Sequence, residues 1–159
     1  MNYDIVVIGA GHAGIEAALA SARMGCKTAM VTLKKGTIGL MSCNPAIGGV
    51  GKGQLVKEID ALGGAMGLAA DACGIQFRIL NASKGAAVHS SRAQIDMYRY
   101  NAYMIDLVTK QKALEVVEAE AVALLIEDGV VRGIKTSVNE ELIGSCDIIA
   151  AGTFLNGLI

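Results

Sequence analysis

The chain has 159 residues, of which 53% are hydrophobic and 18% are charged, and its formal net charge at pH 7 is -1. This length fits a single domain with a substantial core. A net charge so close to zero gives no overall attraction to nucleic acid, and 4% aromatic residues leave little material for stacking single-stranded bases. The composition therefore excludes a general nucleic-acid-binding module, so any RNA contact has to be local or made by other segments.

The N-terminal segment predicts a βαβ unit. Residues 3–8 are a β-branched run that meets glycine, which is typical of a buried strand ending in a tight turn. Residues 13–24 follow as a helix of small residues and leucine that Gly25 closes, and residues 27–33 form a second strand. We expect a right-handed crossover with the two strands parallel.

The chain start, the apolar runs and the cysteines indicate the compartment. The first strand begins almost at the initiator methionine, and no uninterrupted stretch of about 18 apolar residues occurs. We therefore expect no signal or transit segment, no membrane contact and a cytoplasmic protein. The cysteines form no CxxC pair, so neither a zinc site nor a disulfide framework is expected. Apolar residues surround Cys26, Cys73 and Cys146 in the sequence, and Cys43 lies in a predicted loop.

The middle of the chain predicts a long loop and two helices. Residues 34–53 are rich in glycine and show neither a helical nor a strand period, and loops of this length are usually functional. Apolar residues then recur at helical spacing over 55–66, and Gly63-Gly64 interrupts them, which predicts a helix followed by a second short helix. Residues 74–80 look extended, and residues 81–85 indicate a turn.

The last part predicts a helix followed by strands. The helix covers residues 92–111, and its apolar face consists of Ile95, Tyr98, Ala102, Ile105 and Val108. Residues 114–127 and 130–137 flank Asp128-Gly129, a favoured hairpin turn. Residues 146–152 run from apolar residues into glycine, as a buried parallel strand does. The predicted fold class is α/β: a parallel sheet with helices on both sides and a β-meander.

The glycine-rich turn after the first strand is the clearest chemical motif. Its GxGxxG spacing lies directly after a strand and opens a helix, where a dinucleotide-binding turn has to lie. The first glycine allows the sharp turn, the second lets a pyrophosphate approach the backbone, and the third lets helix and strand pack closely. The helix N-terminus supplies N–H groups and a partial positive charge. The predicted cofactor-binding residues here are Gly9, Ala10, Gly11, His12, Ala13 and Gly14.

The identity of the dinucleotide is less clear from the same region. An acidic residue at the end of the second strand would bind the ribose, but that end reads Thr32-Leu33-Lys34-Lys35. The two lysines equally suit a phosphorylated ribose, so spacing alone leaves NADP open. The later order, a long helical excursion, a β-meander and a strand running into Ala151-Gly152-Thr153, resembles flavoproteins of the glutathione-reductase type and favours FAD.

Three segments are more specific than the glycine pattern. They read MSCNPAIGGVGKGQLVKEIDALGGAMG from residue 41, GIQFRILNASKGAAVHSSRAQ from residue 74, and GTFLNG from residue 152. With them, essentially the whole chain closely resembles the MnmG (GidA) family. The resemblance implies an FAD enzyme that adds a carboxymethylaminomethyl group to carbon 5 of the wobble uridine of certain tRNAs. It also implies a GTPase partner (MnmE), methylene-tetrahydrofolate as one-carbon donor, NADH as reductant and a homodimer.

Members of that family are several times longer than this chain. The resemblance therefore implies that residues 1–159 are the N-terminal part of an FAD/NAD(P)-binding domain. The substrate-binding insert, the second half of the FAD domain and the C-terminal helical domain that receives the GTPase are then expected to lie outside it.

The resemblance also implies roles for individual residues. Val122, in the strand after the long helix, would meet the adenine end of FAD through its backbone, and Gly152 would approach the cofactor. The flavin would lie along the loop Asn44-Pro45-Ala46-Ile47-Gly48-Gly49. Cys43 matches a family cysteine suspected of covalent or acid/base work on the uracil ring, and Lys52 would lower the pKa of its thiol.

Simpler interpretations stand beside these roles. Cys43 equally fits a loop cysteine without a catalytic base, and His12 fits a spacer in the turn. Four basic residues fit either a rim for tRNA phosphates or the flavin pyrophosphate, or scattered surface charge: Lys52, Lys84, Arg78 and Arg92. The alternative functions are a folate- and FAD-dependent tRNA uridine methyltransferase, a general FAD or NAD(P) oxidoreductase, and a nucleotide-binding module without catalysis.

Overall fold

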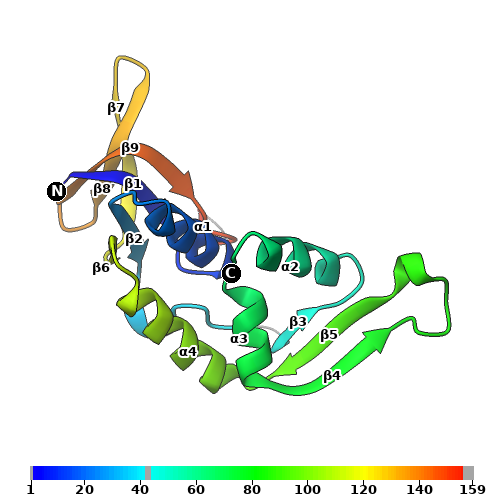
Figure 1. Ribbon diagram of the computed structural model, residues 1–159. Helices are drawn as coiled ribbons and strands as arrows, with labels where there is room; N and C mark the ends of the chain where they lie inside the picture. Colours follow the sequence, from blue (N-terminus) through cyan, green and yellow to red (C-terminus); the bar gives the residue numbers. More distant parts are fainter. Residues whose placement is uncertain (1, 42–43, 156–159) are drawn as a thin grey trace. The chain divides into compact units, whose positions relative to one another are not determined.

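The computed structural model describes residues 2–41 and 44–155 of the chain (Figure 1). The chain divides into two compact units. The first unit consists of Met1–Gly39 and Ile105–Ile159, and the second unit consists of Leu40–Met104. Most of the excursion between the second predicted strand and the meander is therefore a compact unit of its own.

The first unit is built on a mainly parallel sheet. Strand β1 (Asn2–Ile8) pairs in parallel with β2 (Thr28–Thr32) and with β9 (Glu141–Ile149), and β2 pairs in parallel with β6 (Leu114–Glu118). Helix α1 (His12–Arg23) connects β1 to β2. The predicted βαβ unit with parallel strands is confirmed.

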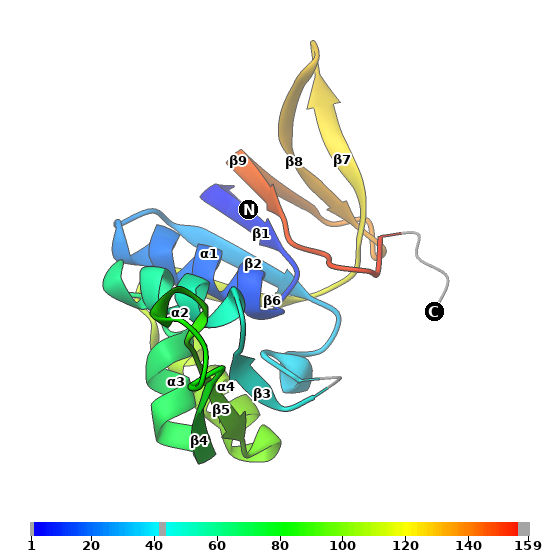
Figure 2. The same ribbon diagram turned by 90° about the vertical axis from the view of Figure 1, so that its right-hand side faces the viewer.

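Two antiparallel strands extend this sheet at one edge. Strand β7 (Ala121–Glu127) and strand β8 (Val130–Thr136) form a hairpin, and β8 pairs with β9. The turn residues Asp128 and Gly129 have φ angles of 50° and 77°, as a type I′ hairpin turn requires. Among the described residues the sheet has six strands in the order β6-β2-β1-β9-β8-β7 (Figure 2).

The predicted single strand over residues 114–127 is wrong, because the segment divides into β6 and β7. The backbone turns at Ala119 and Glu120: the N–H of Ala119 donates to the carbonyl of Thr32, and the carbonyl of Glu120 accepts from Ser137. β6 therefore joins β2 at one edge of the sheet, while β7 lies at the other edge. Such long-range pairing cannot be read from local periodicity.

Gly25 ends α1 as the sequence predicts. It has a φ of 90°, and its N–H donates to the carbonyl of Ala22 at 3.0 Å while the N–H of Cys26 donates to that of Ser21 at 3.2 Å. These two bonds form a Schellman motif, which satisfies carbonyls that the helix end would leave exposed.

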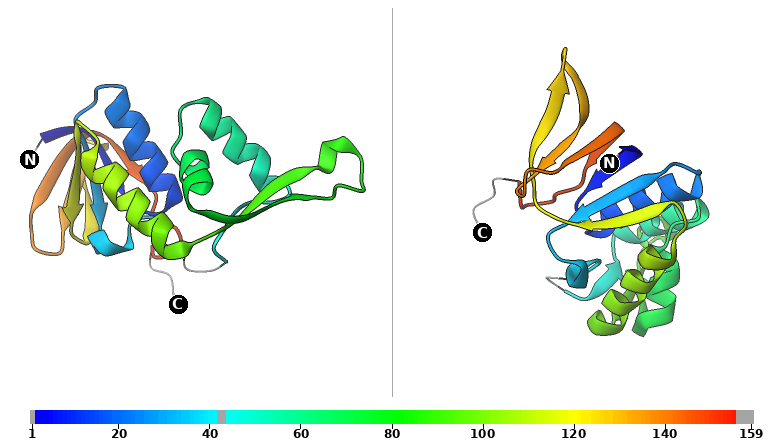
Figure 3. Two further views of the ribbon diagram at one scale, coloured as in Figure 1. Left: turned by 60° about the horizontal axis from the view of Figure 1, so that its bottom comes forward. Right: turned by 90° about the vertical axis from the view of Figure 1, so that its left-hand side faces the viewer.

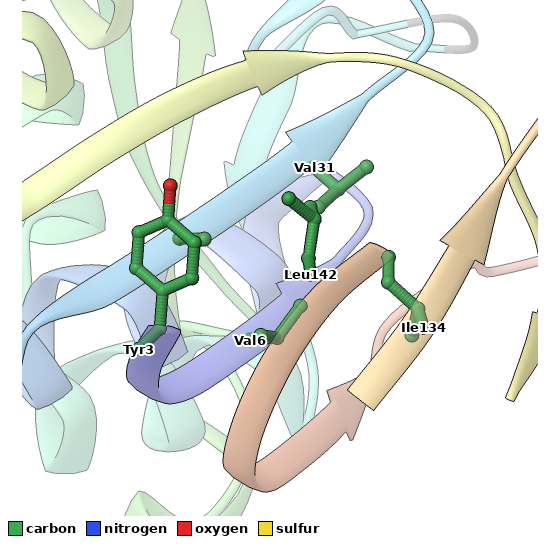
Figure 4. Close-up of a cluster of buried hydrophobic side chains, with 6 residues drawn as sticks. Tyr3, Val6, Val31, Ile134 and Leu142 are labelled. Atoms are coloured by element: carbon green, nitrogen blue, oxygen red, sulfur yellow. The ribbon is translucent and has the colours of Figure 1, made fainter. Parts of the chain in front are cut away.

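A cluster of apolar side chains forms the core on the sheet of the first unit. Figure 4 shows Tyr3, Val6, Val31, Ile134 and Leu142 packed together from β1, β2, β8 and β9. Helix α1 buries small and aliphatic residues, including Ile15, Ala18 and Leu19. Burial of a side chain as large as isoleucine or leucine stabilises a fold by about 1.5–3 kcal/mol.

The second unit has its own small antiparallel sheet. Strands β3 (Ala46–Gly48), β5 (Ser90–Ile95) and β4 (Gly74–Leu80) are arranged in the order β3-β5-β4. Strands β4 and β5 form a long two-stranded ribbon (Figure 3, left). The extended segment predicted over residues 74–80 is confirmed.

Two helices accompany this sheet, as predicted. Helix α2 (Lys52–Ala61) and helix α3 (Met66–Cys73) are separated at Gly63, whose φ is 82°. The apolar residues that predicted α2 are not all buried, since Leu55 is 58% exposed and Leu62 is 86% exposed. In the described parts of the chain no helix has both the length and the apolar character needed to cross a bilayer.

The loop predicted over residues 34–53 contains regular structure. It includes a short 3-10 helix (Lys35–Thr37), strand β3 and the first residues of α2. Strand β3 forms by pairing with β5, which lies more than 40 residues later in the chain. A three-residue strand with such a distant partner leaves no periodic signal in the sequence.

The helix predicted over residues 92–111 begins too early. Residues 90–95 form β5, and helix α4 (Met97–Lys110) starts after Asp96. The Asp96 carboxylate accepts hydrogen bonds from the N–H groups of Tyr98 and Arg99, both at 3.1 Å, and so caps the helix. Tyr98, predicted on the apolar face, is 78% exposed, and the buried residues of the helix are Tyr100, Met104 and Val108.

Candidate dinucleotide-binding site

The turn between β1 and α1 brings backbone atoms into very close contact. Gly9 has a φ of 108°, and a Cβ atom there would overlap the carbonyl oxygen of Ala150. A Cβ atom on Gly14 would overlap the carbonyl oxygen of Gly9. The N–H of Gly9 donates to the carbonyl of Val31 at 2.8 Å, and that of Ala150 donates to Ile8 at 2.8 Å. Both glycines are therefore required for close packing of strand, turn and helix.

Gly11 differs from these two glycines because it is exposed and unobstructed. It is the N-cap of α1, with φ -74° and ψ -176°, and apart from its chain neighbours no described atom lies within 4 Å of the position that a Cβ would take. No side chain in the described part of the chain caps this helix end, and no acidic residue lies in its first turn. An anion can approach backbone N–H groups and the positive end of the helix dipole here. The turn thus fits a dinucleotide pyrophosphate.

His12 contributes little positive charge to this helix end. Its imidazole is half-buried, and burial lowers its pKa, against a smaller opposing effect of the Glu16 carboxylate. The ring is therefore neutral near pH 7, and the favourable field at the turn comes from the backbone. Of the other two residues in the turn, Ala10 is buried and accepts the N–H of Gly39 at 2.9 Å, and Ala13 is exposed.

A carboxylate lies at the end of β2, although the sequence of β2 contains none. In the parallel pair β2–β6, Thr32 is the register partner of Glu118. The Glu118 carboxylate accepts the backbone N–H of Lys35 at 2.7 Å. It therefore lies at the carboxyl edge of β2, where an acidic residue of a dinucleotide-binding fold meets the ribose. Sequence reasoning missed Glu118 because only the strand register places it there.

The second predicted glycine motif follows β9. Ala150 contacts Gly9, so the start of this motif lies beside the glycine turn. Gly152 is exposed with a φ of 60°, and apart from its chain neighbours no described atom lies within 4 Å of the position that its Cβ would take. Val122 is 54% exposed and lies on β7, which is the second strand after α4 and not the first as predicted.

The predicted flavin loop belongs to the second unit. Asn44 is exposed and Pro45 is half-buried, and the Pro45 carbonyl accepts the N–H of Ile95 at 2.7 Å. Gly48 and Gly49 have φ angles of 92° and 110°, which only glycine adopts readily.

The loop is held by β5 and by α2. Gly49 donates its N–H to the carbonyl of Ser91 at 2.9 Å, and its own carbonyl accepts the hydroxyl of Ser90. The loop backbone is therefore fixed at its C-terminal end. Lys52 is exposed at the start of α2. The predicted catalytic residue, Cys43, lies outside the described residues.

The other cysteines behave differently from one another. Cys73 is buried, and burial raises the pKa of its thiol. Cys146, expected in apolar surroundings, is exposed, although β9 lies between β1 and β8 in the sheet. Cys26 is partly buried. Among the described residues no three His, Cys, Asp or Glu side chains are close enough together to hold a metal ion.

The parallel strands, the glycine turn and the meander define a Rossmann-like fold of the FAD-binding type. Several solved structures of low sequence identity share this fold, among them PqsL, a probable FAD-dependent monooxygenase from Pseudomonas aeruginosa, with a TM-score of 0.65 and 14% identity over 96% of this chain and 43% of that one. Residues 4–159 match the family described as glucose inhibited division protein A. The chain belongs to this family, as its sequence predicts.

Close relatives agree with the assignment. The chain is 58% identical over its whole length to the tRNA uridine 5-carboxymethylaminomethyl modification enzyme MnmG of Campylobacter fetus, and it covers 26% of that protein. The crystal structure of Aquifex aeolicus GidA superposes with a TM-score of 0.95 at 52% identity, over 98% of this chain and 26% of that one. The chain thus spans about a quarter of the length of these relatives.

Proposed function

We propose that the turn from Gly9 to Gly14 binds the pyrophosphate of FAD, and that the complete protein modifies the wobble uridine of tRNA. The observation that carries the proposal is the open space at Gly11, above a helix N-terminus without a side-chain cap. The names of the close relatives support the reaction. Bound FAD would supply the redox chemistry of the modification.

The residues of the turn divide the work of binding. Gly9 and Gly14 hold the helix end against the strand, and Gly11 leaves room for the phosphates. Gly152 lies on the neighbouring connection and would approach the cofactor, while the backbone of Val122 would meet the adenine. In the second unit, the loop from Asn44 to Gly49 would lie along the flavin.

Glu118 favours FAD over NADP. Its carboxylate at the end of β2 can accept a hydrogen bond from a ribose hydroxyl, as the acidic residue of dinucleotide-binding folds does. The same carboxylate would repel a ribose 2′-phosphate. Although Lys34 and Lys35 follow β2, the Lys35 backbone is bonded to Glu118, so the local site is not purely cationic.

Cys43 is our proposed catalytic residue. Carbon 5 of a pyrimidine becomes nucleophilic once a nucleophile has added at carbon 6, and a thiolate is suited to that addition. Lys52, at the start of α2, would favour the thiolate form. The family resemblance supports methylene-tetrahydrofolate as the one-carbon donor, NADH as reductant, the GTPase MnmE as partner, a homodimer and a cytoplasmic location.

The rival functions differ in product. A tRNA uridine methyltransferase would leave a methyl group on carbon 5, whereas a general oxidoreductase or a non-catalytic nucleotide-binding module would leave tRNA unchanged. The 52–58% identity to GidA and to MnmG proteins supports carboxymethylaminomethyl addition over these alternatives. Binding of FAD by this chain and activity of the complete protein are separate proposals, because the chain spans 26% of such relatives.

Mass spectrometry of tRNA nucleosides tests the proposed reaction. In cells that depend on the complete protein, we expect a carboxymethylaminomethyl-type group on the wobble uridine, which Cys43→Ser abolishes. Cys146→Ser, at an exposed cysteine outside the proposed site, serves as the matched control and should retain the modification. Retention in Cys43→Ser would remove that residue from the mechanism, and a methyl group as the sole product would favour the methyltransferase.

A further inference from the structure

Two arginines face each other on the sheet of the second unit. In the antiparallel pair β4–β5, Arg78 lies directly opposite Arg92, and Gln76 lies opposite Gln94. Among the described residues neither guanidinium has an ion-pair or hydrogen-bond partner. Like charges directly opposite each other destabilise a sheet, and no counter-charge within the described structure offsets this repulsion.

The same face of the sheet is hollowed. A cavity of about 210 Å³ is lined by Gln76, Arg78, Leu80, Arg92 and Gln94. These residues alternate along β4 and β5 and therefore share one face of the ribbon. No acidic side chain lines this cavity. Both arginines also line a neighbouring cavity that includes Asp60 and Asp71, but neither guanidinium is paired with these carboxylates among the described residues.

The neighbouring strand β3 leaves this face open. In the register of β3 and β5, Ala46 lies opposite Gln94 and Gly48 lies opposite Arg92. Ala46 carries only a methyl group, and Gly48 carries no side chain. The two arginines and two glutamines thus stand beside a strand of small residues. A ligand has room to lie across the sheet at the guanidiniums.

We propose that this face binds a phosphodiester group of an RNA strand between Arg78 and Arg92, with Gln76 and Gln94 contacting the adjoining ribose. Guanidinium forks match the geometry of phosphate oxygens. A carboxamide offers a donor and an acceptor, as does the 2′-hydroxyl that distinguishes RNA from DNA. The inference rests on the proposed tRNA substrate and names a place on this chain that meets its backbone.

RNA is favoured over the pyrophosphate of the dinucleotide as the anion at this face. The pyrophosphate has a matching place at Gly11 and the N-terminus of α1, in the first unit. The chain has a net charge of -1, so RNA binding requires a local concentration of positive charge. The facing arginines provide it.

Fluorescence anisotropy with a tRNA anticodon stem–loop tests this inference in the complete protein. We would measure affinity between about 50 and 200 mM salt for the wild type, Arg78→Gln and Arg92→Gln. Each variant should bind on the order of tenfold more weakly, and its slope of log affinity against log salt should fall by about 0.7–0.9. Arg78→Lys should keep the slope and lose part of the affinity, because it keeps the charge without the fork.

A matched control and a second measurement separate this inference from the proposed function. Arg132→Gln removes an exposed arginine of β8 in the first unit and should bind RNA as the wild type does. Flavin absorbance should be equal in all variants. Wild-type affinity for RNA in Arg78→Gln and Arg92→Gln would overturn the inference and leave the proposed function standing. Loss of flavin absorbance in these two variants with RNA binding intact would also overturn the inference. Absence of RNA binding by the wild type would overturn the proposed function and the inference together.

Discussion

A Cβ atom on Gly14 would overlap the carbonyl oxygen of Gly9, so these two glycines pack backbone against backbone where β1 meets α1. Gly11 lies between them in sequence, and the position that its Cβ atom would take is free of described atoms apart from its chain neighbours. The three glycines of one motif therefore have two distinct physical roles. Two of them build the turn, and one leaves space for a ligand.

Gly14→Ala is expected to destabilise the chain. The added methyl group would force α1 away from the turn, and overpacking of this kind costs about 1–3 kcal/mol. Urea unfolding followed by circular dichroism would measure the loss as a lower transition midpoint. An unchanged midpoint would show that the turn and α1 are not packed as described.

Gly11→Ala is expected to leave folding stability within about 1 kcal/mol of the wild type. Its φ of -74° suits alanine, and the reduced freedom of the unfolded chain offsets the poorer N-cap. The same urea experiment provides the comparison with Gly14→Ala. A large loss of stability at Gly11 would contradict the assignment of that glycine to ligand space.

Asp96→Ala is expected to destabilise α4 by about 0.5–2 kcal/mol, because the Asp96 carboxylate caps two N–H groups at the helix start. Asp106→Ala is the matched control on the same helix. Asp106 forms an exposed ion pair with Lys110, for which a loss of about 0.3–0.5 kcal/mol is typical. Equal effects of the two substitutions in urea unfolding would contradict the capping role.

Asp147→Asn is expected to stabilise the chain at neutral pH. Both carboxylate oxygens of Asp147 are buried and have no hydrogen-bond partner among the described residues, and burial raises the pKa of this group. The folded state therefore holds the proton more tightly than the unfolded state does. Stability falls as pH rises from the ordinary carboxyl pKa through the raised one.

The gain from Asp147→Asn should consequently disappear in acid, below the ordinary carboxyl pKa. Urea midpoints at neutral and acidic pH measure this difference. Asp128→Asn, in the exposed hairpin turn, is the control for the substitution itself and should keep the wild-type midpoint, since asparagine also suits its φ of 50°. A gain for Asp147→Asn that is equal at both pH values would contradict the assigned cause.

Local signals in the sequence sufficed for the first βαβ unit. The β-branched run, the glycine turn and Gly25 each specify their own backbone conformation, so β1, α1 and β2 could be predicted within about two residues. The family segments were equally informative about identity. They also predict Cys43 as the catalytic residue, which lies outside the described residues and stays a prediction.

Long-range pairing accounts for the elements that could not be predicted. Strand β5 was assigned to a helix because its pairing with β3 and β4 is invisible in a local window, although Asp96 was an available signal for a helix start. The same limit hid Glu118, whose position depends on the register of β6 against β2. The sequence of the ribbon could not show that Arg78 faces Arg92, because that contact also depends on register.

The visible absorbance spectrum of the complete protein after desalting tests the central claim most directly, with Gly11→Ala beside the wild type. We predict flavin bands in the wild type and their loss in Gly11→Ala, whose folding stability is preserved. Full flavin content in Gly11→Ala would contradict the placement of the pyrophosphate. A colourless wild type that binds NADP would contradict the assignment of FAD itself.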